Sequence, residues 1–96
     1  MSIPEDSKKI VRYFLDKAVE YGDLDMISSD FRFSYDSLAS ALDLKDGKYC
    51  CICCQYLTGH GYVDVKAQRK ESDTDKNSVQ RCVRLFSSAI DFLETT

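Results

Sequence analysis

The stretch of sequence from residue 35 to residue 63, YDSLASALDLKDGKYCCICCQYLTGHGYV, decides the fold that we expect for this chain. Apolar residues recur at helical spacing in its first part and predict a short helix over residues 35–42. Residues 43–47 contain an Asp-Gly pair and predict a turn, and residues 47–59 predict a second helix. Two helices joined by so short a turn cross at a steep angle, so we expect the second helix to protrude.

The sequence on both sides of this stretch adds a long helix, a hairpin and a closing helix. The long helix is predicted by apolar residues at helical spacing before Gly22. The hairpin is predicted by alternation of apolar and polar residues on both sides of a wholly polar segment. In chain order we expect a helix over 4–21, a very short strand over 31–33, the two helices above, a strand over 62–66, an exposed polar loop over 68–78, a strand over 79–85 and a short helix from Ser87 or Ser88.

Length and composition indicate one small domain over residues 1–96. The chain has 96 residues, of which 44% are hydrophobic and 30% are charged, as in ordinary globular proteins. Such a composition excludes a disordered or collagen-like chain. No apolar run approaches the roughly 20 residues of a membrane span, and the first residues are unlike a signal peptide. We therefore expect a cytoplasmic protein that does not interact with a membrane.

Motifs for catalysis are absent from the sequence. It contains no glycine-rich phosphate-binding motif and no nucleophile elbow, and no pair of carboxylates accompanies the single histidine, His60. We therefore expect a protein that is not an enzyme and that has no cofactor.

Charge is spread unevenly along the chain, whose formal net charge is −3. Residues 1–44 carry five basic and nine acidic side chains, whereas residues 66–84 carry six basic and three acidic ones. A negative total is unusual for a protein devoted to nucleic acid, which commonly shows a basic footprint. Two interpretations stay open: the second half presents a locally positive face to DNA, or both regions are solvated surfaces.

Three motifs resemble the winged helix-turn-helix superfamily, which includes small transcription regulators of bacteria, archaea and viruses. They are Leu-Ala-x-x-Leu at 38–42, Leu57 followed by Gly61-Tyr62-Val63, and residues 83–94, which look like a final wing strand that runs into a closing helix. The resemblance covers nearly the whole chain. It implies an α+β fold with the order helix, short strand, helix, helix, two-stranded wing and short C-terminal helix. It also implies a DNA-binding transcription regulator, usually a homodimer, which we expect to form through helix 4–21 and the closing helix.

The resemblance places helix 47–59 in the major groove of duplex DNA. If Cys50, Cys54 and Leu57 face the core, the exposed positions of this helix are Lys48, Tyr49, Cys51, Ile52, Gln55 and Tyr56. Among these, Gln55 is the side chain suited to reading a base edge, adenine above all. Ammonium and phenol groups near the helix predict phosphate contacts from Lys45, Lys48, Tyr49 and Tyr56. The wing adds cations for a minor groove or for phosphates, namely Lys66, Arg69, Lys70 and Lys76.

A second function is compatible with the same helix. Cys51, Ile52 and Tyr56 predict an apolar surface on it, and such a surface is typical of contacts with protein. Since a fold alone does not determine function, the alternative is a winged-helix module that binds a protein partner and no DNA.

The five cysteines predict reduced thiols. Their number is odd and four of them lie in one octet, unlike the spread, even set of a secreted disulfide framework. We interpret the four clustered residues as small hydrophobic side chains of the core. Two lesser alternatives are a thiol redox sensor and a soft-metal site, because C-x-x-C spacing makes neighbours on a helix of Cys50, Cys51, Cys53 and Cys54.

Overall fold

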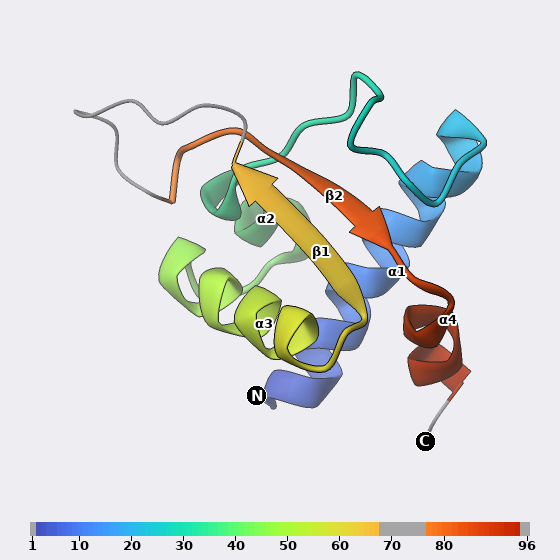
Figure 1. Ribbon diagram of the computed structural model, residues 1–96. Helices are drawn as coiled ribbons and strands as arrows, with labels where there is room; N and C mark the ends of the chain where they lie inside the picture. Colours follow the sequence, from blue (N-terminus) through green and yellow to red (C-terminus); the bar gives the residue numbers. More distant parts are fainter. Residues whose placement is uncertain (1, 68–76, 95–96) are drawn as a thin grey trace.

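Three helices, two strands and a final helix follow one another in this chain, close to the order that the sequence predicts. The computed structural model describes residues 2–67 and 77–94. Within them it has an α+β fold of four helices and a two-stranded antiparallel sheet (Figure 1). In chain order the elements are α1 (Ile3–Tyr21), α2 (Tyr35–Leu42), α3 (Gly47–Gly59), β1 (Val63–Ala67), β2 (Arg81–Leu85) and α4 (Ser87–Glu94). None of these helices is long and apolar enough to cross a membrane.

Local hydrogen bonds explain where the first three helices begin. The Ser2 hydroxyl accepts a hydrogen bond from the Glu5 amide, and α2 opens with a reciprocal capping box between Ser34 and Ser37. The Asp46 carboxylate accepts a hydrogen bond of 2.8 Å from the Tyr49 amide at the start of α3. These side chains satisfy amides that a helix cannot pair internally. The helix boundaries are therefore encoded locally.

The predicted short strand over 31–33 and the predicted strand over 79–85 are both shorter in the structure. Phe33 forms an isolated bridge in which it exchanges two backbone hydrogen bonds with Arg81, and Asp25 forms another with Arg84. The chain between these two bridges leaves the edge of β2, so no continuous ladder forms. Residues 77 and 78 form a turn, residues 79 and 80 are not part of a strand, and β2 begins only at Arg81. β2 therefore lies between β1 and two isolated contacts.

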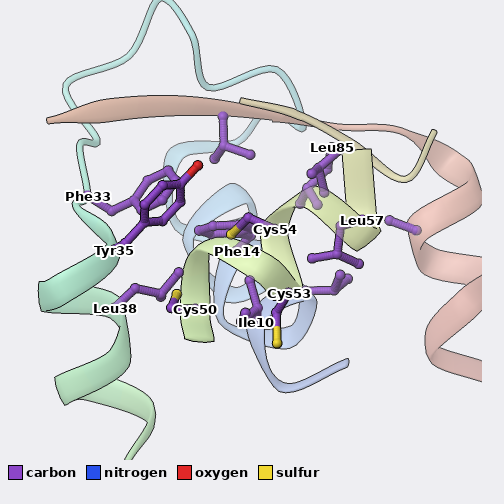
Figure 2. Close-up of a cluster of buried hydrophobic side chains, with 14 of the residues drawn as sticks. Ile10, Phe14, Phe33, Tyr35, Leu38, Cys50, Cys53, Cys54, Leu57 and Leu85 are labelled. Carbon is purple, nitrogen blue, oxygen red and sulfur yellow. The ribbon is translucent and has the colours of Figure 1, made fainter. Parts of the chain in front are cut away.

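The core is built around the inner side of α3. α1 contacts the other three helices and β2, and α3 contacts α2 and β1 as well (Figure 1). The sheet adds Val63, Val83 and Leu85, which are buried. Figure 2 shows the side chains that converge where these elements meet, among them Ile10, Phe14, Leu38, Cys50, Cys53, Cys54 and Leu57. Small thiol side chains alternate there with larger aliphatic and aromatic ones, which allows α3 to pack closely.

We predict that Leu57→Ala destabilises the protein and that Ile52→Ala does not. Leu57 is fully buried in α3, so its truncation removes buried surface and leaves a cavity, at a cost of about 2–5 kcal/mol. Ile52, on the same helix, is 46% exposed, and its truncation should change the free energy of unfolding by less than about 0.5 kcal/mol. Urea denaturation followed by circular dichroism measures both values. Equal losses in the two variants would contradict this orientation of α3.

Candidate nucleic-acid interface

One side of α3 is directed away from the core. Lys48, Ile52 and Gln55 are exposed and follow one another at intervals of four and three residues, so they lie on one face of the helix. We refer to these three residues as the outward face of α3. Cys50, Cys54 and Leu57 occupy the opposite side and are buried, as the sequence predicts. Packing on the inner side therefore determines which side chains a partner can meet.

Three residues predicted to be exposed on α3 are not part of the outward face. Cys51 is buried, with 6% of its surface exposed, and its sulfur accepts a hydrogen bond of 3.5 Å from Gln55 Nε2. Tyr49 and Tyr56 are half-buried on the flank between the outward face and the core. Residues seven positions apart lie on the same side of a helix, so the sequence spacing already indicates that Tyr49 and Tyr56 share one flank. The apolar surface expected from Cys51, Ile52 and Tyr56 thus reduces to Ile52.

The Tyr49 hydroxyl has a partner within the protein. It donates a hydrogen bond of 2.5 Å to the Asp6 carboxylate of α1, next to a hydrogen bond of 3.4 Å from the Ser7 hydroxyl to the Cys53 carbonyl. Loss of hydration, together with the hydrogen bond to Asp6, raises the pKa of Tyr49. The Tyr49 hydroxyl thus links α3 to α1, and its predicted phosphate contact stays a prediction.

The Tyr56 ring belongs to an aromatic group at the C-terminal end of α3. Its centroid lies 4.5 Å from that of His60, which stacks on Tyr62, and Tyr62 in turn stacks on Phe92 of α4 at 4.5 Å. Lys8 of α1 lies over the Phe92 ring. The group joins α3, the start of β1, α4 and α1. His60, to which the sequence assigns no catalytic role, thus contributes its ring to this packing.

The chain that enters β2 from the loop of the hairpin lies against the start of α2 and α3. The Asp36 amide donates a hydrogen bond of 3.0 Å to the Asn77 carbonyl, and Asn77 is buried. A Cβ atom at Gly47 would lie 3.2 Å from Asn77 Cβ and would collide with the Asp36 carboxylate. Glycine therefore permits the close approach of α2, α3 and residue 77. This contact keeps the start of β2 on the same side of the molecule as the N-terminal end of α3.

The structure describes the exposure of only some of the predicted DNA-binding cations. Lys45, Lys48 and Lys66 are exposed. Arg69, Lys70 and Lys76 lie outside the described residues. Carboxylates accompany the exposed lysines around the α2–α3 turn, where Asp36, Asp43 and Asp46 are exposed too.

Two arginines within residues 66–84 contact other side chains of the same protein. The Arg81 guanidinium lies 4.4 Å from the centroid of the Tyr35 ring, and Arg84 forms an ion pair of 3.1 Å with Asp25. A hydrogen bond from the Ile27 amide, followed by the contact with Arg84, lowers the pKa of Asp25. The positive charge available to an outside ligand is therefore smaller than the sequence suggests.

The structure places all five cysteines in the interior, and for the four clustered ones this agrees with the packing interpretation. Burial raises the pKa of Cys53, and a hydrogen bond with Cys50 together with burial raises that of Cys54. Neutral thiols are poor nucleophiles and poor metal ligands. Within residues 2–67 and 77–94, no group of three or more histidine, cysteine or acidic side chains is placed to hold a metal ion.

Comparisons with known proteins give no relative: no protein-family model, no curated protein and no solved structure matches the chain.

We predict that the thiols of the native protein are protected. All five are buried, and those of Cys53 and Cys54 are held in the neutral form, so a thiol reagent at pH 7.5 should modify them only as fast as the protein opens. The same reagent should modify all five at once in denaturant. Absorbance of the released reagent group measures both rates. Immediate modification of two or more thiols in the native state would contradict the packing interpretation.

We predict that the contribution of Asp25 to stability depends on pH. A carboxyl with a lowered pKa in the folded state stabilises the protein above its unfolded pKa, and this effect disappears as the pH falls through the folded pKa. Asp25→Asn should therefore be less stable than the wild type at pH 7, and the difference should vanish well below pH 3.8, the ordinary pKa of the group. Urea denaturation across this range tests it, with the exposed Asp16→Asn as control. A difference independent of pH would contradict the ion pair.

Proposed function

We propose that the chain is a winged-helix domain that binds duplex DNA, with α3 in the major groove and the β1–β2 hairpin beside it, and that it acts as a transcription regulator. The observation that carries this proposal is the outward face of α3, exposed along a helix that is supported from behind by α1 and α2. A groove reader needs a rigid helix with one such face.

The dimensions of α3 are compatible with this role. Its 13 residues give a length of about 20 Å at 1.5 Å per residue. A helix with side chains is about 10–12 Å wide, close to the roughly 12 Å width of the major groove. The bridge of Phe33 with Arg81 supports the winged-helix assignment, since Phe33 lies in the short strand over 31–33 that the resemblance implies between the first two helices.

Charge supports the proposal through a few side chains. Lys48 belongs to the outward face, Lys45 precedes α3, and Lys66 is exposed on β1. Each of these ammonium groups can neutralise one phosphate and release its condensed counterions. Asp46 caps α3, so the helix N-terminus is already satisfied by a carboxylate. We therefore assign phosphate contacts to the three lysines.

A protein partner is the second candidate, and one observation favours it. The exposed carboxylates Asp36, Asp43 and Asp46 accompany Lys45 and Lys48, and Ile52 exposes 46% of its surface in the middle of the outward face. A mixed-charge surface with an apolar centre is typical of contacts between proteins. The expected homodimer through α1 and α4 is a separate proposal. Val19 and Tyr21 of α1, 75% and 44% exposed, are apolar side chains available to such a contact.

We predict that the protein binds duplex DNA and that Lys48→Ala weakens this binding for all sequences about equally. Removal of one phosphate contact should reduce the slope of log affinity against log salt concentration by about one. Lys17→Ala, on α1 and away from the outward face, should leave the slope unchanged. Fluorescence anisotropy at several salt concentrations measures these slopes. Absence of binding to any duplex at low salt contradicts the proposal and favours the protein partner.

A further inference from the structure

We infer that α3 selects A·T base pairs, with Gln55 reading an adenine and Ile52 contacting the methyl group of a thymine. The inference rests on the proposed binding of duplex DNA and adds the class of sequence that the domain recognises. It depends on the orientation of two side chains of the outward face, Ile52 and Gln55.

The two residues are spaced for neighbouring base pairs. They are three positions apart on one face, so they lie about 4.5 Å apart along the helix axis. Successive base pairs are about 3.4 Å apart along the duplex. A helix that lies in the major groove can therefore present Ile52 to one pair and Gln55 to the same pair or the next one.

The contact between Gln55 and Cys51 favours a fixed orientation of the amide. Gln55 Nε2 donates a hydrogen bond of 3.5 Å to the sulfur of Cys51, which is buried and held by the packing of α3. An amide nitrogen has two hydrogens, so the second hydrogen and Oε1 stay available to a ligand. This pair, one donor and one acceptor, is complementary to N7 and the N6 amino group of adenine.

Ile52 also favours A·T over G·C base pairs, because its side chain has no polar atoms. The C5 methyl group of thymine can cover the exposed Ile52 side chain, and a G·C pair offers no such group in the major groove. Against a G·C pair, Ile52 would also cover the cytosine amino group without giving it a hydrogen-bond partner. Lys48, which we assign to phosphate, contributes the same contact to every sequence.

The first experiment selects duplexes from a pool. A pool with a randomised core is bound by the full chain at low salt, and the bound fraction is sequenced. We expect cores enriched in A·T pairs. Binding without enrichment overturns this inference and leaves the proposed function intact, whereas no binding to the pool overturns both.

The second experiment removes single groups from a selected duplex. Uracil in place of thymine removes only the C5 methyl group, and 7-deazaadenine in place of adenine removes only the N7 acceptor. At one position each, we expect the wild type to bind about four-fold more weakly to the uracil duplex. We expect a loss of about three- to ten-fold with 7-deazaadenine.

Variants then assign each loss to a side chain. Ile52→Ala should no longer distinguish thymine from uracil but should still respond to 7-deazaadenine, and Gln55→Ala should show the opposite pattern. Ser40→Ala, an exposed change on α2, should behave like the wild type. If either analogue weakens the binding of the wild type and of the matching variant equally, that side chain does not read that base, and the inference is wrong.

Discussion

The packing of the inner side of α3 against α1 and α2 is the constraint on which the rest of the structure depends. Cys50, Cys53, Cys54 and Leu57 are fully or almost fully buried there. Their burial fixes the rotation of α3 about its axis, and this rotation leaves Lys48, Ile52 and Gln55 on the outside. The hydrogen bond from Tyr49 to Asp6 and the ring contact between Tyr56 and His60 then stabilise the flank of the helix. The candidate interface is thus a consequence of the core.

Much of the fold could be predicted from the sequence because its signals are local. Helical spacing of apolar residues, together with Gly22 and the Asp-Gly turn, locates the helices to within one or two residues. The sequence predicts extended chain over 31–33 and 79–85, but the two bridges and the start of β2 depend on which distant residues pair, for example Phe33 with Arg81. Alternation indicates that a segment is extended but does not identify the residues with which it pairs.

The candidate site could be predicted only in part. The pattern identifies Lys48, Ile52 and Gln55 as exposed, and the structure agrees. The same pattern predicts that Tyr49 and Cys51 are exposed. In the structure both are covered by neighbouring elements, Tyr49 in part and Cys51 almost fully. Counting cations overestimates the positive surface, because Arg84 is neutralised by Asp25, a partner that lies more than fifty residues earlier. Charge becomes a property of a surface only after folding.

The return strand of the hairpin is held by main-chain groups, and this has an evolutionary consequence. Backbone groups of Asn77, Arg81, Val83 and Leu85 form the hydrogen bonds that join this strand and the residues before it to the N-terminal half of the chain. Main-chain bonds survive the replacement of side chains, so substitutions on the exposed side of this strand can occur while its path is preserved. A scaffold of this kind lets surface chemistry diverge quickly without a matching drift in architecture.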